Sequence, residues 1–186
     1  MNEQGPIPKT VESEITTEQI IALSRKVTVL MTKPENTGTK APLLLFLKNK
    51  GLNALKYRFT LDEDRLNSLY TMMKDWIATV QMATEQHMED KEVEVFLVTS
   101  EDGECKDVRE EVLKLRGLDR VASNNPVGTL RNELPGQTIF YAGTEADSTV
   151  QYSRNGFHCS TTPEEVLSNL KTFGLLDEAK RLVGVE

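Results

Sequence analysis

One long stretch, residues 62–90, sets the strongest constraint on how this chain can fold. Its apolar residues recur every three or four positions, the period of an amphipathic α-helix. They are Leu66, Leu69, Tyr70, Met73, Trp76, Ile77, Val80 and Ala83. Asp62 is suited to cap such a helix, and neither glycine nor proline interrupts it. The sequence therefore predicts one long helix that serves as the spine of a core and buries Trp76.

The same stretch also fits the heptad pattern of a coiled coil, in which apolar residues alternate at spacings of three and four. The seam would be formed by Leu66, Leu69, Met73, Trp76, Val80, Ala83 and His87. Under this interpretation the apolar face joins two copies of the chain. A homo-oligomer formed through the 62–90 helix therefore stays open as an alternative.

Length and composition predict one domain with an appendage. A chain of 186 residues with 38% apolar content can bury a sizeable core. We expect a mobile tail over 1–15 and a single α+β domain over 16–186, with a possible sub-division into a helical part, 16–90, and an α/β part, 91–186. The apolar runs are too short to span a bilayer. With Cys105 and Cys159 far apart in sequence, we expect free thiols in a cytoplasmic or otherwise intracellular compartment, and no membrane partner.

Helix and strand signals are spread along the rest of the chain. Periodicity and capping residues predict helices over 16–33, 42–50, 104–115, 162–174 and 175–183, and strands over 52–59, 92–98, 137–142, 149–153 and 157–160. The apolar 92–98 strand is expected to be central in its sheet. The predicted fold class is α+β, with a helical N-terminal half packed on a small mixed β-sheet. The alternative is a thioredoxin-like α/β arrangement in the C-terminal half, with a second parallel strand at 120–123.

Charge is distributed unevenly along the chain. The net charge is -7, yet residues 19–61 contain eight basic residues and one acid, Glu35. Such an asymmetry predicts a basic surface on an otherwise acidic molecule. Within the basic segment, cations that could neutralise phosphates alternate with aromatic rings that could stack on bases. The candidate anion-binding residues are Lys48, Lys50, Lys56, Arg58 and Tyr57.

From this basic segment we predict a non-enzymatic binding or assembly protein. It would engage an anionic partner, either RNA or DNA or an acidic protein surface, through residues 25–58. The alternative interpretation of the same residues is an ordinary solvated face over buried aromatic side chains. Residues 124–131, which end at Arg131, form a second and weaker candidate for anion binding through backbone amides.

The one candidate for catalysis is Cys105, near the start of the predicted 104–115 helix. A helix N-terminus favours the reactive thiolate. However, Asp102, Glu104 and Asp107 surround this thiol with negative charge, and no Cys-x-x-Cys pair is present. We therefore predict no catalytic residue. A thioredoxin-like thiol oxidoreductase that uses Cys105, or its inactive descendant, is the alternative function.

Other chemistry-bearing patterns are weak or absent in the sequence. His158 and Cys159 are adjacent in a predicted strand, so their side chains should point to opposite faces. With two histidines and two cysteines far apart, a four-ligand zinc site would need all of them to converge, so no metal is predicted. The sequence contains no Walker loop and no dinucleotide glycine pattern, and no cofactor is predicted. The acids between 89 and 111 are interpreted as a solvated face.

Overall fold

The computed structural model describes most of the chain. The described residues are 15–37, 40–71, 78–118, 124–133, 137–142, 149–154 and 156–185. The predicted tail over 1–15 therefore lies almost entirely outside the described residues.

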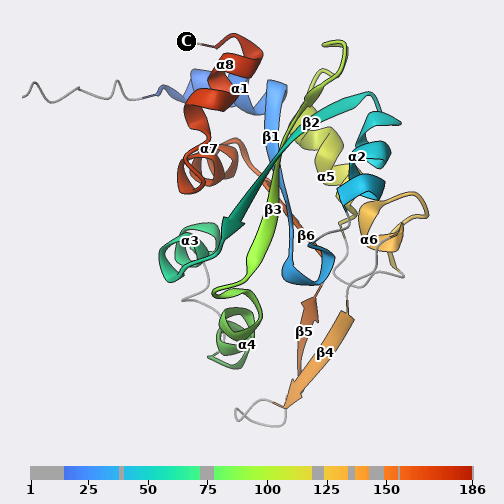
Figure 1. Ribbon diagram of the computed structural model, residues 1–186, viewed down its shortest axis with the longest axis vertical. Helices are drawn as coiled ribbons and strands as arrows, with labels where there is room; N and C mark the ends of the chain where they lie inside the picture. The colour runs from blue at the N-terminus through green and yellow to red at the C-terminus, as the bar shows by residue number, and fades with distance from the viewer. Residues whose placement is uncertain are drawn as a thin grey trace, which may run out of the picture.

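A four-stranded sheet forms the centre of the molecule (Figure 1). Its strands are β1 (Val27–Thr32), β2 (Leu52–Thr60), β3 (Glu92–Ser100) and β6 (Phe157–Cys159), in the order β2-β3-β1-β6. Every pairing in it is antiparallel, so the predicted mixed sheet is wrong. A separate two-stranded sheet pairs β4 (Gln137–Ala142) with β5 (Thr149–Arg154). The central position predicted for the 92–98 strand is confirmed, because β3 lies between β2 and β1.

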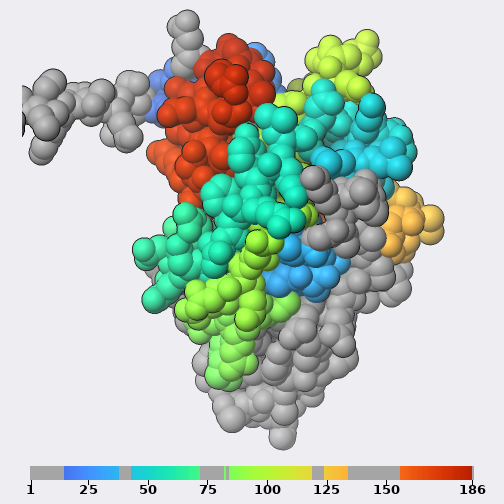
Figure 2. All heavy atoms as spheres, in the orientation of Figure 1, coloured from blue at the N-terminus to red at the C-terminus, as the bar shows by residue number. Residues whose placement is uncertain are grey.

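Helices cover both faces of the sheet (Figure 1). In chain order they are α1 (Thr17–Lys26), the 3-10 turn η1 (Pro34–Asn36), α2 (Lys40–Lys48), α3 (Glu63–Leu69), α4 (Ala78–Met88), α5 (Val108–Arg116), α6 (Leu130–Glu133), α7 (Pro163–Thr172) and α8 (Leu176–Val183). The helices α3, α7 and α8 lie on one face, and α2 and α5 lie on the other. Figure 2 shows β2, an edge strand, between the C-terminal helices and α2.

The alternation of side chains along the strands divides the core into two clusters. On β3, Val95 belongs to the cluster beneath α3, α7 and α8, and Phe96 belongs to the cluster beneath α2 and α5. The first cluster includes an aromatic pair in which the ring centroids of Phe59 and Phe173 are 4.9 Å apart. Because both faces of the central strands are buried, their sequences read as continuous apolar runs.

The single helix predicted over 62–90 is wrong. The helix α3 ends at Leu69, and Tyr70 takes a non-helical backbone conformation with φ -122° and ψ 54°. The apolar spacing of the sequence does not reveal where the backbone leaves the helical conformation. Helix resumes as α4 at Ala78. Met73 and Trp76 lie outside the described residues, so the predicted burial of Trp76 stays a prediction, as does a homo-oligomer through this stretch. Leu66 and Leu69 of the proposed seam are buried in the core of the chain itself.

The helix predicted over 16–33 is correct only in its first part. Its start is confirmed, because Thr16 and Gln19 form a reciprocal capping box. The helix ends at Lys26, and the β-branched run that follows, Val27 to Val29, belongs to β1. Three of the four sheet strands consequently come before residue 101, and the prediction of a helical N-terminal half is wrong.

The thioredoxin-like alternative required a parallel strand at 120–123, which lies outside the described residues. The strands that the structure describes pair only antiparallel. The Asn-Gly pair at 155–156 favours a tight turn that would return residues 157–160 onto the strand at 149–153, but β6 pairs with β1 instead. None of the helices in the described part of the chain is long and apolar enough to cross a membrane.

Candidate anion-binding site

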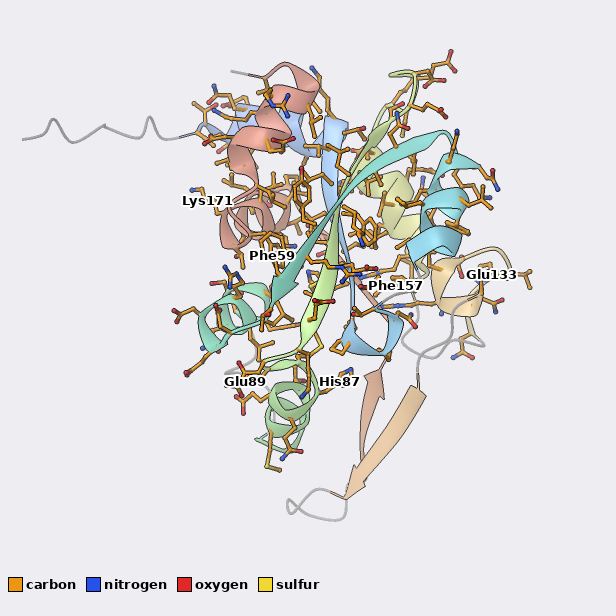
Figure 3. All side chains as sticks on the ribbon, viewed as in Figure 1. Phe59, His87, Glu89, Glu133, Phe157 and Lys171 are labelled. Atoms are coloured by element: carbon orange, nitrogen blue, oxygen red, sulfur yellow. The ribbon has the colours of Figure 1, made fainter. Side chains whose placement is uncertain are left out.

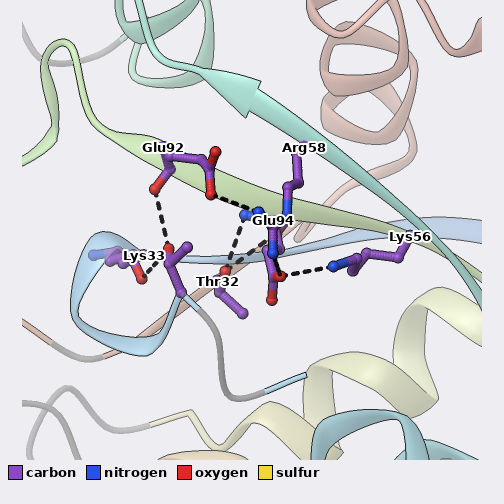
Figure 4. Close-up of polar contacts among 7 residues, drawn as sticks. Thr32, Lys33, Lys56, Arg58, Glu92 and Glu94 are labelled. Atoms are coloured by element: carbon purple, nitrogen blue, oxygen red, sulfur yellow. Dashed lines mark hydrogen bonds and ion pairs between the residues drawn. The ribbon is translucent and has the colours of Figure 1, made fainter. Parts of the chain in front are cut away.

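Two of the predicted anion-binding residues neutralise a buried acid (Figure 4). Glu94 of β3 is fully buried, and its Oε1 atom lies 2.8 Å from Lys56 Nζ and 3.4 Å from Arg58 Nη2. The register of β2 against β3 places both cations on the face of the sheet that carries Glu94. Arg58 also contacts Glu92 at 3.2 Å. The charges of Lys56 and Arg58 are therefore largely compensated within the fold.

The other three predicted residues lie elsewhere. Lys48 and Lys50 are exposed at the end of α2, next to the start of β2, and Lys50 Nζ is 5.9 Å from the centroid of the Phe46 ring. Tyr57 points to the opposite face of β2, where burial and the neighbouring Glu178 carboxylate raise its pKa. The structure thus brings Lys56 and Arg58 together but places Tyr57 on the other face.

A second group of charged residues surrounds His158 on β6. In the sheet register His158 stands opposite Met31, so its ring points toward the helices α3 and α7. The residue is only 9% exposed. Its Nε2 atom lies 3.2 Å from Asn169 Nδ2 and 3.6 Å from Glu165 Oε1. The Tyr70 ring stands edge-on to the imidazole, with 5.6 Å between the two centroids.

Local sequence signals position these groups. Gly156 adopts a positive φ of 76° in the turn before β6, a conformation that favours glycine, and its carbonyl accepts a 2.8 Å hydrogen bond from the backbone N–H of Lys33. Thr162 caps α7 as predicted, and Pro163 begins the helix. Glu165 and Asn169 are then four residues apart on one face of α7, directed at β6.

The electrostatic environment keeps the His158 ring neutral. Burial lowers the pKa of His158 to about 4, and the positive charges of Lys33, Arg116 and Arg131 act in the same direction. The negative charge of Glu165 opposes them. We call His158 and these three basic residues the His158 cluster. At neutral pH three basic residues and one acid, Glu165, therefore act electrostatically on an uncharged imidazole.

Arg131 joins this cluster to the strand that carries the histidine. It is 5% exposed, and its guanidinium donates hydrogen bonds to the carbonyls of Gly117 at 3.1 Å and Phe157 at 3.4 Å. The weaker sequence candidate, residues 124–131, thus contributes its arginine to the cluster. The Gly128 amide of the same segment donates to Glu133 Oε1 at 2.9 Å, so it serves an internal contact.

Glu35 ties three segments together beside the cluster. One carboxylate oxygen lies 2.7 Å from Nε2 of His87, the α4 residue labelled in Figure 3, and the other accepts a 2.8 Å hydrogen bond from the Gly156 backbone amide. Burial alone would raise the pKa of Glu35. The hydrogen bonds from His87 and Gly156 outweigh burial and hold this pKa below its usual value.

Replacing Glu35 by glutamine is expected to lower the free energy of unfolding at pH 7 by roughly 1–3 kcal/mol, because a partly buried, hydrogen-bonded carboxylate is lost. The folded-state pKa is depressed, so the contribution of Glu35 is present above its unfolded pKa and is lost as pH falls through the folded value. Urea titrations between pH 7 and pH 3 should therefore converge for the two proteins. Glu89→Gln, at an exposed position just after α4, is the matched control and should change stability little.

The two cysteines lie in different environments, Cys105 partly buried before α5 and Cys159 buried on β6. The helix α5 begins at Val108 after the cap Asp107, so Cys105 precedes the helix instead of lying in its first turn as predicted. Cys159 is buried against Leu30 in the other core cluster, which raises its pKa to about 11. The predicted separation of His158 and Cys159 onto opposite faces is confirmed. Within the described residues, the structure brings together no group of three or more potential metal ligands.

Sequence reasoning missed Lys33, Asn169 and the convergence on His158. One signal was present, because Asn169 lies between Val166 and Leu170 on the buried face of α7, where an apolar residue is expected. A polar side chain in such a stripe indicates a buried partner. Lys33 follows directly after a wholly buried strand, which also places it near the core.

Comparisons with known proteins place the fold among nucleoside diphosphate kinases. Three similar solved structures are those of the enzymes from Borrelia burgdorferi, Aquifex aeolicus and Encephalitozoon cuniculi. The Borrelia burgdorferi structure is a transition-state mimic with bound vanadate and ADP. Their TM-scores are 0.59, 0.59 and 0.58, with sequence identities of 16%, 14% and 18%. The alignments cover 80% of this chain and 86%, 94% and 88% of those chains. No family model and no curated protein sequence matches the chain. The α+β fold thus resembles the ferredoxin-like fold of these kinases.

Proposed function

We propose that this chain binds a nucleoside phosphate and holds its phosphate groups at the His158 cluster. The observation that carries the proposal is the charge around His158. Three cations act on the buried imidazole, and a single carboxylate opposes them. A phosphate group carries negative charge and several acceptor oxygens, which basic side chains bind through charge-assisted hydrogen bonds.

The fold likeness supports a nucleotide over other phosphates. The Borrelia burgdorferi enzyme that shares this fold is described with ADP and vanadate bound. At identities of 14–18% this likeness extends to the fold, so the argument for this chain depends on its own residues. Lys33 directly follows β1, Arg131 lies on α6 and His158 lies on β6, so basic residues from distant parts of the sequence act on the imidazole.

The proposed partner is an anion, as predicted from the sequence. The cations proposed to bind it are those of the His158 cluster and not those of the basic segment. Lys56 and Arg58 compensate Glu94, which makes them weaker candidates than the His158 cluster. Binding of RNA, DNA or an acidic protein through residues 25–58 stays a prediction from sequence. The proposal requires no chemical reaction, in keeping with the predicted absence of a catalytic residue.

Replacing Lys33 by glutamine is expected to weaken ADP binding about 10- to 100-fold, because a charge-assisted hydrogen bond contributes about 1.5–3 kcal/mol. Isothermal titration calorimetry on the full chain measures the change. ADP should bind far more tightly than adenosine, since the proposed contacts are made by the phosphates. Equal affinities for ADP and adenosine would contradict the proposal.

The matched control is the double substitution Lys48→Gln/Lys50→Gln. It removes two exposed cations that the sequence marked as anion-binding and that lie outside the His158 cluster. ADP affinity should stay within about twofold of the unmodified chain, because exposed charges far from a ligand are screened by salt. A larger loss in this double variant than in Lys33→Gln would move the site back to the basic segment.

A further inference from the structure

The hydrogen-bond partners of His158 determine which of its two ring nitrogens carries the proton of the neutral imidazole. An uncharged imidazole carries one proton, on either Nδ1 or Nε2, and the hydrogen bond made by one nitrogen decides the state of the other. The neighbour of Nε2 is the side-chain amide of Asn169, 3.2 Å away. This amide is buried, with Asn169 only 1% exposed, so its orientation is held by the surrounding protein.

Asn169 directs its amide nitrogen, a donor, toward the histidine. The same Nδ2 atom is 2.9 Å from Ser160 Oγ, so its two hydrogens are matched to two acceptors. Within the described residues, Asn169 Oδ1 has no hydrogen-bond partner. If the Asn169 amide were rotated by 180°, its two N–H donors would occupy the place where Oδ1 now has no partner. Two buried donors would then be unmatched instead of one carbonyl oxygen. Unmatched buried donors are the rarer defect, so the observed orientation is favoured.

Glu165 does not compete for the Nε2 position. Its Oε1 atom is 3.6 Å from Nε2, too far for a hydrogen bond. Its Oε2 atom accepts two hydrogen bonds of 2.6 Å, from the backbone amide and from the hydroxyl of Thr161. The carboxylate is therefore anchored on the turn before α7, and the Asn169 amide is the group that contacts Nε2.

We propose that Asn169 fixes the His158 tautomer that carries its proton on Nδ1. Asn169 acts as a positioning residue, because it sets what the ring can offer through the other nitrogen. A protonated Nδ1 donates a hydrogen bond to a phosphate oxygen. It has no lone pair with which to form an N–P bond while the P–O bond to a leaving nucleotide breaks. The chain would thus bind a nucleoside phosphate without becoming phosphorylated on His158, and this consequence rests on the proposed function.

Long-range ¹H–¹⁵N correlation NMR of the ligand-free chain tests directly which nitrogen of His158 carries the proton. The protein has two histidines, so His158→Gln assigns the signals by elimination. Long-range ¹H–¹⁵N correlation at pH 7 should show a protonated Nδ1 and an unprotonated Nε2 for His158. The opposite pattern would overturn the inference, whatever the outcome of ADP binding.

Two variants test whether Asn169 sets the tautomer. Asn169→Asp preserves the shape of the side chain but presents only acceptor oxygens, so the proton should appear on Nε2. Glu165→Gln removes the nearby carboxylate charge and should leave the Nδ1–H pattern unchanged. An unchanged pattern in Asn169→Asp, or an altered one in Glu165→Gln, would refute the role of Asn169. If Asn169→Asp does not fold, the spectrum of the unmodified chain still decides the proton position.

Incubation with ATP labelled at its γ-phosphate tests the consequence. The unmodified chain should retain no more label than His158→Gln after removal of free nucleotide. Label that disappears in His158→Gln would refute the inference. A failure to bind ADP in calorimetry would instead refute the proposed function and leave the tautomer result standing.

Discussion

Replacing Phe96 by alanine is expected to lower the free energy of unfolding by about 3–5 kcal/mol, the usual cost of truncating a fully buried aromatic residue. Phe96 is 0% exposed on the central strand β3 and belongs to the core cluster beneath α2 and α5. Removing its ring leaves a cavity that the strands on both sides, β2 and β1, cannot close without losing their register. Urea denaturation monitored by circular dichroism measures the change.

The control for Phe96 is Leu45→Ala on α2. Leu45 is 60% exposed, so its truncation removes little buried surface and should change stability by no more than about 0.5 kcal/mol. A loss below about 1 kcal/mol for Phe96→Ala would show that this cluster is not the tightly packed core that the fold describes.

Replacing Glu94 by alanine is expected to cost about 3 kcal/mol, at the lower end of the range for breaking a buried ion pair. Glu94 is fully buried, whereas Lys56 is 16% exposed and can recover part of its hydration once its partner is removed. The Thr32 hydroxyl contacts only the backbone of Glu94, so this contact should survive the substitution. Chemical denaturation at pH 7 provides the measurement.

Two further variants separate the ion pair from simple loss of volume. Glu92→Gln removes an exposed acid from the same strand and should change stability by less than about 1 kcal/mol. The double variant Lys56→Met/Glu94→Leu removes both partners and should recover most of the stability, because no charge is left buried alone. If the double variant is as unstable as Glu94→Ala, then the loss comes from packing and not from the charge.

Local features of the fold could be predicted from the sequence. Thr16 and Gln19, and Thr162 with Pro163, marked two helix starts correctly because capping depends on residues close in sequence. The apolar run of β3 gave its central position for a similar reason, since burial on both faces leaves a continuous pattern. Signals of this kind need no knowledge of the tertiary structure.

The candidate site could not be predicted, because its members meet only through tertiary pairing. Lys33 and His158 are brought together when β6 pairs with β1, and the sequence indicated a hairpin with β5 instead. The helix α3 ends at Tyr70, whose ring stands edge-on to His158, although the apolar spacing of the sequence continues past this residue. The basic segment was visible as composition, but composition does not reveal that Glu94 lies opposite Lys56 and Arg58.

The order of the strands also bears on the synthesis of the protein. β1, β2 and β3 are consecutive in the sheet-forming part of the chain and can pair while the remainder is still on the ribosome. β6 can take its place beside β1 only after the long segment between β3 and β6 has also been synthesised, and it pairs through three residues. The nascent protein would therefore fold its hydrophobic centre first. The proposed phosphate site would form later, when β6 pairs with β1 and the turn at Gly156 bonds the backbone of Lys33.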